Sequence, residues 1–255
     1  MDQEVLYVVK DRVAYLTINR EAKRNAISIN VIKQLSTYLN AVENDKNARA
    51  VCITGAGDKA FCVGADLAGS MDTSGDDPQQ LYADLLKRIA AFPKPTLARV
   101  NGYCLAGGTG FMLACDIVVA SATAKFGTPE VNVGLWPMMI GALIFRNVLK
   151  KKAMQMILLG EKLTAAEALE MGLITRVVAP EQLNAEIEKI LAILRTKSPL
   201  GMKLGKAAFY HTADMDFEEA LDYLCAQIKV VSTTEDAIEG ITAFFEKRAP
   251  DFKGK

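Results

Sequence analysis

Two turns of small residues and one isolated glutamate are the parts of this chain whose residue types could do chemistry. Gly107-Gly108 lies where an apolar run passes into an apolar helical segment, and Gly64-Ala65 repeats that arrangement earlier in the sequence. Such turns leave backbone N–H groups unblocked at the start of a helix, where a developing negative charge can be held. Glu130 follows in a nearly uncharged neighbourhood. An N–H pocket for an oxyanion and one acid/base group are the minimum needed for enolate chemistry beside a carbonyl group.

Segments that alternate between strand-like and helix-like patterns must position these residues. Strands are predicted at 5–9, 13–18, 50–55, 96–100 and 174–178, and helices at 29–42, 78–92, 142–149, 153–159, 181–194, 200–209, 217–231 and 237–245. Ser28 predicts the N-cap of the first helix, and Thr164 with Glu167 has the spacing of a capping box. Helices alone follow residue 180, so we place a boundary near Ser198.

The composition of the 255-residue chain is that of a globular enzyme and argues against several other classes. It contains 30 Lys+Arg and 30 Asp+Glu, so the chain has no net positive charge that would attract nucleic acid or an anionic membrane. The five cysteines lack paired spacing, which argues against a disulfide framework or a zinc site and favours buried cysteines. The acidic N-terminus and the absence of a membrane-length apolar run argue against a signal peptide or a spanning helix. We therefore expect a cytosolic protein.

Several polar residues are interpreted as structural. Asp66 is expected to be an N-cap or to have another structural role, and Asp116 is expected to be a buried, hydrogen-bonded acid. His211, the only histidine, is expected in a solvated loop between helices, so a Ser/His/Asp triad has no support. Residues 69–77 are small and acidic without periodicity and are expected to be the most mobile segment.

The chain carries five motifs, spaced in order between residue 60 and the last residue: AFCVGADL, KPTLARVNGYCLAGGTGFMLACDIVVAS, KFGTPEVNVGL, LTAAEALEMGLITRVV and AFFEKRAPDFKGK. With these motifs it resembles the crotonase, or enoyl-CoA hydratase/isomerase, superfamily. The resemblance implies an α/β fold, with a crotonase-like spiral of ββα repeats over 1–197. It implies a C-terminal helical region over 198–255 that builds homotrimers, often paired into hexamers. It also implies an acyl-CoA thioester as substrate, with coenzyme A as part of the substrate and no metal or redox cofactor.

The resemblance assigns roles to individual residues. Ala65 and Gly107 match the family positions whose backbone N–H groups bind the thioester oxygen, and Glu130 matches the glutamate of the family's Pro-Glu pair. Loss of one such N–H donor typically costs about 3 kcal/mol of barrier. Positions matching those that line the coenzyme or the acyl group supply the other candidates: Arg24, Asn25, Ala26, Asp66, Leu67, Gly108, Trp136, Met138, Phe252 and Lys253.

Gly110 is the main departure from the family's pattern. The family's hydratases have a second glutamate at this position, because adding water requires a water to be deprotonated while a proton is delivered to carbon. Moving a double bond from the 3 to the 2 position of an enoyl-CoA needs one base, which returns the proton two carbons away. The sequence therefore favours isomerisation over hydration, with Glu130 as the single acid/base group. Burial beside Phe126, Val131 and Trp136 is expected to raise its pKa.

Three alternatives stay open. The first is a 2-enoyl-CoA hydratase with a relocated second acid/base group. The second is another reaction of the superfamily, such as thioester hydrolysis, decarboxylation or dehalogenation; hydrolysis or dehalogenation would need a further group, for which 69–77 is the candidate segment. The third, from a different class, is a non-catalytic acyl-CoA-binding oligomer, against which the presence of Glu130 argues.

Overall fold

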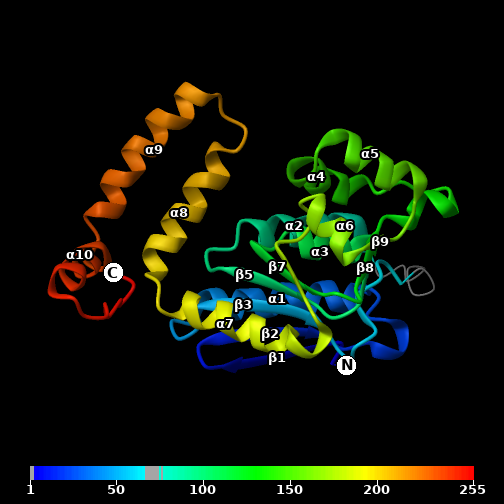
Figure 1. Ribbon diagram of the computed structural model, residues 1–255, viewed down its shortest axis with the longest axis horizontal. Helices are drawn as coiled ribbons and strands as arrows, with labels where there is room; N and C mark the ends of the chain where they lie inside the picture. The colour runs from blue at the N-terminus through cyan, green and yellow to red at the C-terminus, as the bar shows by residue number, and fades with distance from the viewer. Residues whose placement is uncertain (1–2, 67–74, 76) are drawn as a thin grey trace.

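The described residues, 3–66, 75 and 77–255 of this computed structural model, form two β-sheets, surrounding helices and three C-terminal helices (Figure 1). The larger sheet has the strand order β1 (Val5–Lys10), β2 (Val13–Ile18), β3 (Ala50–Gly55), β5 (Thr96–Val100), β7 (Ile117–Ser121) and β10 (Arg176–Val178). The smaller sheet has the order β4 (Ala60–Cys62), β6 (Tyr103–Leu105), β8 (Lys125–Gly127) and β9 (Leu163–Thr164). All neighbouring strands are parallel except the β1–β2 and β8–β9 pairs.

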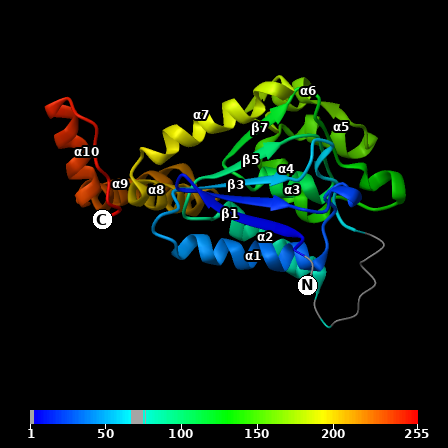
Figure 2. The same ribbon diagram turned by 90° about the horizontal axis from the view of Figure 1, so that it is seen from below.

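The larger sheet is covered on both faces, because alternate side chains of each strand enter different apolar clusters. On β3, Ala50 and Cys52 pack in the cluster that contains α7 (Leu183–Arg195). Val51 and Ile53 point the other way, into the main core with α1 (Ile29–Asn44) and α2 (Pro78–Ala90). Figure 2 shows α7 on one side of the strands and α1 on the other. A strand buried on both faces is apolar throughout, which explains why 50–55 is recognisable in the sequence.

After β1, β2 and α1, each of the next three turns of the chain adds a strand to the larger sheet, a strand to the smaller sheet and then a helix. β3 and β4 lead to α2, and β5 and β6 lead to α3 (Gly107–Leu113). β7 and β8 lead through the short 3-10 helix η2 (Pro129–Val133) to α4 (Met138–Asn147). The predicted spiral of ββα units is therefore present.

The other helices of this part differ from the predictions mainly at their ends. α4 begins at Met138 rather than 142, and α5 (Lys150–Leu159) begins three residues before the predicted start. The first turn of α5 is three lysines, which apolar periodicity cannot detect. Ser28 caps α1, and Thr164 and Glu167 form the predicted capping box of α6 (Ala165–Glu170). The 3-10 helices η1 (Glu21–Lys23) and η3 (Pro180–Gln182) complete the region, and β10 is shorter than the predicted strand 174–178.

Three helices, α8 (Pro199–Thr212), α9 (Phe217–Ser232) and α10 (Glu235–Glu246), lie to one side of both sheets (Figure 1). Ser198, at the predicted boundary, is the N-cap of α8. Asp116 of the spiral forms an ion pair with Lys206 of α8 and accepts a hydrogen bond from Thr96 N at 2.7 Å. Its structural role is confirmed, although its side chain is partly exposed.

Two expectations for this helical part are wrong. His211 is exposed, as expected, but it lies inside α8 rather than in a loop, with its ring 4.6 Å from that of Tyr223, because no residue from 209 to 212 breaks the helix. Cys225 is exposed on α9, whereas the other four cysteines are buried. Among the described residues, no helix has the length and apolarity needed to cross a bilayer.

Candidate active site

Three linkers at one edge of the smaller sheet carry the residues predicted to do chemistry. Ala65 follows β4, Gly107 follows β6 and Glu130 follows β8. β6 is the parallel neighbour of both β4 and β8. Because the carboxyl ends of adjacent parallel strands meet at the same edge of a sheet, these residues converge although they are far apart in the sequence.

Ala65 directs its backbone N–H away from its bridge partner. Ile27 forms an isolated parallel bridge with Ala65, in which the Ile27 N–H donates to the Gly64 carbonyl at 2.8 Å. The Ile27 carbonyl accepts from the Asp66 N–H, also at 2.8 Å. In a parallel bridge of this pattern, the N–H of the middle residue points to the opposite side of the strand. The Ala65 amide is therefore not used by this bridge.

The turn before Ala65 touches the turn before Gly107. Gly64 has φ +94°, and a Cβ added there would lie 2.6 Å from Ala106 Cβ and 3.1 Å from Gly107 N. Ala106 has φ +49° and ψ −128°, a conformation that costs a residue with a side chain about 1–3 kcal/mol and that is concentrated at functional sites. Its N–H donates to the Gly127 carbonyl at 3.0 Å. That bond ties the turn to the strand that leads to Glu130.

Glu130 is half-buried in η2, immediately after Pro129. Its Oε2 atom is buried and accepts no hydrogen bond from any residue in the described ranges. Burial raises the pKa of the carboxyl group above its usual value, and the residue's own backbone N–H partly offsets the rise. The predicted direction is confirmed, although Trp136 is 40% exposed and so shields this region less than expected. A weakly solvated carboxyl group of this kind can accept a proton and return it near neutral pH.

The space above Gly110 is filled by other side chains. A Cβ added at Gly110 would lie 2.2 Å from Tyr82 Oη and 2.6 Å from Ile140 Cγ2. Tyr82 comes from α2 and Ile140 from α4, and both side chains are buried. A glutamate at this position would have to displace them. The described structure therefore has no room for a second carboxylate there.

We expect Gly110→Ala to destabilise the protein. Replacing a helical glycine with alanine normally stabilises a helix by about 1 kcal/mol. Here the added methyl group overlaps buried atoms, and overpacking typically costs about 1–3 kcal/mol. The cost should be smaller when Tyr82→Phe has removed the hydroxyl group. Denaturant unfolding of the two single variants, the double variant and the parent gives this coupling directly; a stabilised single variant would show that the space is open.

Comparisons with known proteins identify the family of this chain. A family model described as enoyl-CoA hydratase/isomerase matches residues 9–255. The chain belongs to this family. It is 36% identical to 2,3-dehydroadipyl-CoA hydratase of Escherichia coli and 33% identical to crotonyl-CoA hydratase of Syntrophomonas wolfei, over 99% of both chains in each case.

Solved structures of enoyl-CoA hydratases have the same fold. A structure from Bacillus anthracis superimposes with a TM-score of 0.94 at 29% identity, over 99% of this chain and 100% of that chain. One from Mycobacterium smegmatis gives a TM-score of 0.92 at 33% identity, over 98% and 99% of the respective chains. The protein is an enzyme of the enoyl-CoA hydratase/isomerase family, and the expected crotonase-like α/β fold is confirmed.

Two candidate coenzyme-binding residues of this family member use their side chains inside the protein. Asn25 is fully buried, and its amide nitrogen donates to the carbonyls of Ala56 and Ala60 at 3.0 and 2.7 Å. Asp66 forms ion pairs with Lys23 at 2.8 Å and Arg20 at 2.7 Å, which lower its pKa to about 2. These contacts fit the structural interpretation of Asp66. A contact of either residue with coenzyme A stays a prediction.

Arg20 is a positioning residue that the sequence analysis missed. Besides Asp66 it pairs with Glu4 at 3.0 Å and donates to the Ala26 carbonyl at 2.6 Å. It therefore holds together the segment before Ile27 and the residue after Ala65. No sequence signal distinguishes Arg20 from the other charged residues of this loop, because the contact is with a residue 46 positions away.

The other candidates differ in exposure. Ala26 is buried, and Gly108 lets α3 approach β4, since a Cβ there would lie 2.1 Å from the Cys62 carbonyl oxygen. Arg24 is exposed, and so is Met138, at 73%. Leu67 and most of the segment 69–77 lie outside the described residues. No group of three or more His, Cys, Asp or Glu side chains in the described ranges is placed to hold a metal ion.

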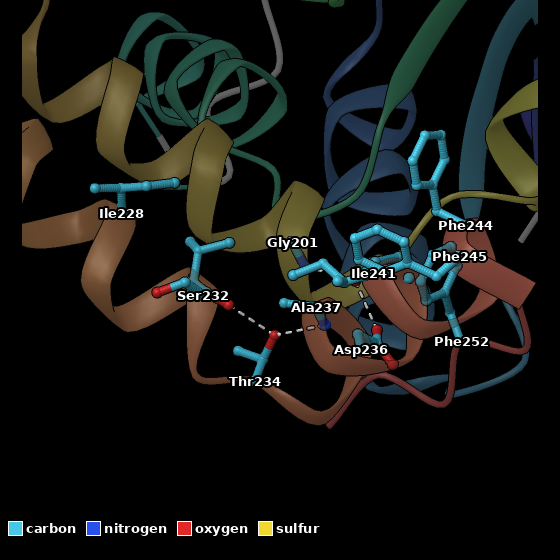
Figure 3. Close-up of a pocket in the computed structure, with 13 residues that line it drawn as sticks. Gly201, Ile228, Ser232, Thr234, Asp236, Ala237, Ile241, Phe244, Phe245 and Phe252 are labelled. Atoms are coloured by element: carbon cyan, nitrogen blue, oxygen red, sulfur yellow. Dashed lines mark hydrogen bonds between the residues drawn. The ribbon is translucent and has the colours of Figure 1, made fainter.

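Phe252 and Lys253 lie in the C-terminal part of the chain. The Phe252 ring packs 3.3 Å from the position of a Cβ on Gly240, beside an apolar cavity of about 560 Å³ between the C-terminal helices (Figure 3). The Lys253 N–H donates to Asp236 at 2.8 Å. α10 and the C-terminus are at the opposite end of the molecule from α3 and β8 (Figure 1). The structure does not bring these two residues to Glu130 of the same chain, and a role at a neighbouring subunit's site stays a prediction.

Proposed function

We propose that this enzyme moves the double bond of a 3-enoyl-CoA to the 2 position, with Glu130 as its single acid/base group. The observation that carries the proposal is the filled space over Gly110, where Tyr82 and Ile140 exclude the second carboxylate that hydration would use. One half-buried carboxyl group with an unpaired oxygen atom remains in the described site. A site with one carboxyl group fits a proton transfer between two carbons better than the addition of water.

The reaction would proceed through a thioester enolate. The N–H groups of Ala65 and Gly107 would donate to the thioester oxygen while Glu130 removes a proton from the carbon beside the carbonyl group. The electron pair of that C–H bond would delocalise onto the oxygen, which the two amides stabilise. Return of the same proton from Glu130 to the fourth carbon would then yield the conjugated 2-enoyl-CoA.

A direct assay separates this proposal from hydration, which the names of the relatives at 33–36% identity favour. The purified enzyme is supplied with a 3-enoyl-CoA and, separately, with a 2-enoyl-CoA, and each reaction is followed by the absorbance of the conjugated thioester. Appearance of absorbance from the first substrate, with slow loss of it from the second, is expected. Fast hydration of the second substrate without isomerisation of the first would establish the hydratase alternative instead.

The activity is expected to depend on pH through Glu130. The carboxyl group must be ionised to remove a proton, so kcat/KM should fall as the pH drops through its pKa. Since burial raises that pKa, the acid limb should lie at higher pH than that of an exposed glutamate. A pH profile of kcat/KM for the free enzyme measures it; an acid limb at or below the ordinary value for glutamate would contradict the assignment.

We also propose that residues 198–255 form the contact between subunits of a homotrimer or hexamer. The support is a set of exposed large apolar side chains on the three C-terminal helices, among them Phe209, Phe217, Ile228, Ile241, Phe244 and Phe245. Exposed apolar surface of this extent is typical of a protein–protein interface. Light scattering of the intact chain gives the mass, and a monomer at micromolar concentration would contradict this assignment.

A further inference from the structure

Tyr82 binds the carbonyl of Gly107, the residue whose N–H is predicted to bind the thioester oxygen, yet nothing in the sequence pattern assigns Tyr82 a role. It is 7% exposed, on the first half of α2. Its hydroxyl group donates to the Gly107 carbonyl at 2.6 Å. Its ring packs at a tilt on Phe111 of α3, with the centroids 5.4 Å apart. The side chain is thus fixed at both its ring and its hydroxyl group.

Gly107 needs such a restraint because it has no side chain of its own to limit its backbone. Glycine populates a wider range of φ and ψ than any other residue, so the direction of its N–H relative to its own carbonyl depends on neighbouring contacts. A Cβ added at Gly107 would lie 3.4 Å from Tyr82 Oη and 2.9 Å from Ile27 Cδ1. These two side chains therefore bound the space around Gly107, and of the two the phenol can hold it by a hydrogen bond.

The hydroxyl group is held in its donor form. Burial raises the pKa of Tyr82 well above its usual value, and the negative charge of Glu130 acts in the same direction. Because the phenol stays protonated and its single hydrogen is directed to the Gly107 carbonyl, it is unsuited to transfer protons to a substrate.

We propose that Tyr82 is a positioning residue for the oxyanion hole: its hydroxyl group holds the Gly107 carbonyl and so restrains the backbone conformation of Gly107, which keeps the Gly107 N–H, on the preceding peptide, directed at the thioester oxygen. This inference rests on the proposed enolate chemistry but not on which enoyl-CoA is the substrate. The proposal predicts that removal of the Tyr82 hydroxyl group weakens polarisation of the substrate carbonyl, although Tyr82 does not touch the reacting atoms.

The test compares Tyr82→Phe with the matched variant Tyr38→Phe. Tyr38 lies on α1, and its ring stacks on that of Tyr7 with the centroids 5.0 Å apart, so this variant also removes one hydroxyl group from a packed tyrosine. The probe is hexanoyl-CoA labelled with ¹³C at the thioester carbonyl, which has no double bond to isomerise or hydrate. Isotope-edited infrared spectroscopy gives the shift of the carbonyl stretch to lower wavenumber on binding. We expect a clear shift in the parent and in Tyr38→Phe, and a smaller shift in Tyr82→Phe.

Kinetics give the second measurement. For the enoyl-CoA that the parent converts, kcat of Tyr82→Phe should fall by about 10-fold to 100-fold while KM changes much less, because misplacement of a catalytic donor affects the transition state most. A residue with a purely structural role would lower the melting temperature and leave the carbonyl shift of the folded fraction unchanged. If Tyr82→Phe folds poorly, Gly110→Ala displaces the same hydroxyl group without removing it.

The outcomes separate the two proposals. An equal carbonyl shift in the parent and Tyr82→Phe, or no shift in the parent, overturns the role of Tyr82. A smaller carbonyl shift in Tyr82→Phe than in the parent supports the role of Tyr82, whichever reaction the enzyme catalyses. If the same enzyme hydrates 2-enoyl-CoA and does not isomerise 3-enoyl-CoA, the proposed isomerase function is refuted.

Discussion

Replacing Glu130 with glutamine is expected to lower kcat for isomerisation by about 10²-fold to 10⁴-fold, the usual contribution of a positioned acid/base group. Glutamine keeps the size of the side chain but cannot take up the proton. KM for the CoA thioester should change little, because the carboxyl group acts on the reacting carbons. Steady-state kinetics with a 3-enoyl-CoA measure both parameters.

The same variant should be more stable than the parent at neutral pH. The folded-state pKa of Glu130 lies above its unfolded value, so folding favours the neutral form of the carboxyl group over the ionised form. This contribution is fully present below the unfolded pKa and is lost as the pH rises through the folded pKa. Thermal melts at acidic and neutral pH should therefore differ more for the parent than for Glu130→Gln.

Glu181 provides the matched control. Like Glu130, it is the second residue of a short 3-10 helix that begins with proline, but it is exposed. Glu181→Gln should leave kcat unchanged. Full activity of Glu130→Gln, or an equal loss in Glu181→Gln, would refute the assignment of Glu130 as the proton shuttle.

Replacing Gly64 with alanine is the second change with a large expected effect. The added methyl group would lie 2.6 Å from Ala106 Cβ and 3.1 Å from Gly107 N, so the two turns must separate. Loss of one oxyanion donor typically lowers kcat by about 10²-fold to 10³-fold, and separation of the turns should cost a similar amount. Kinetics of the folded variant, with circular dichroism to check its fold, measure the effect.

Gly172→Ala controls for the backbone cost of the substitution. Both glycines have positive φ, +94° for Gly64 and +82° for Gly172, but a Cβ at Gly172 meets one neighbouring atom, the Asn147 carbonyl oxygen, at 3.3 Å. Alanine at a positive φ destabilises a protein whatever its surroundings. Gly172→Ala should therefore lose stability and keep its kcat. Similar kcat values for the two variants would show that contact between the turns is not needed for activity.

The sequence predicts the turns of the site better than the side chains that support them. Strand 50–55 is recognisable because buried strands are continuously apolar, and Gly64 and Gly107 are recognisable because glycines mark the points where two backbones approach closely. Glu130 stands out as an isolated charge in an almost uncharged stretch. Tyr82 is different. A tyrosine on the apolar face of a helix has the pattern of a core residue, and no local signal tells which turn its hydroxyl group reaches. Arg20 was missed for the same reason, since its partners lie on separate segments.

The strands that end at the three site turns are very short: β4, β6 and β8 have three residues each. β5 and β6 are separated by two residues, so the small sheet continues directly from the large one. The buried side chains of these strands, among them Phe61, Cys104 and Phe126, belong to the same apolar cluster as Ile53 and Ala98 of the large sheet. Heating should therefore inactivate the enzyme when its β-structure as a whole melts, and thermal inactivation reports on the entire spiral rather than on a local loosening near the bound thioester.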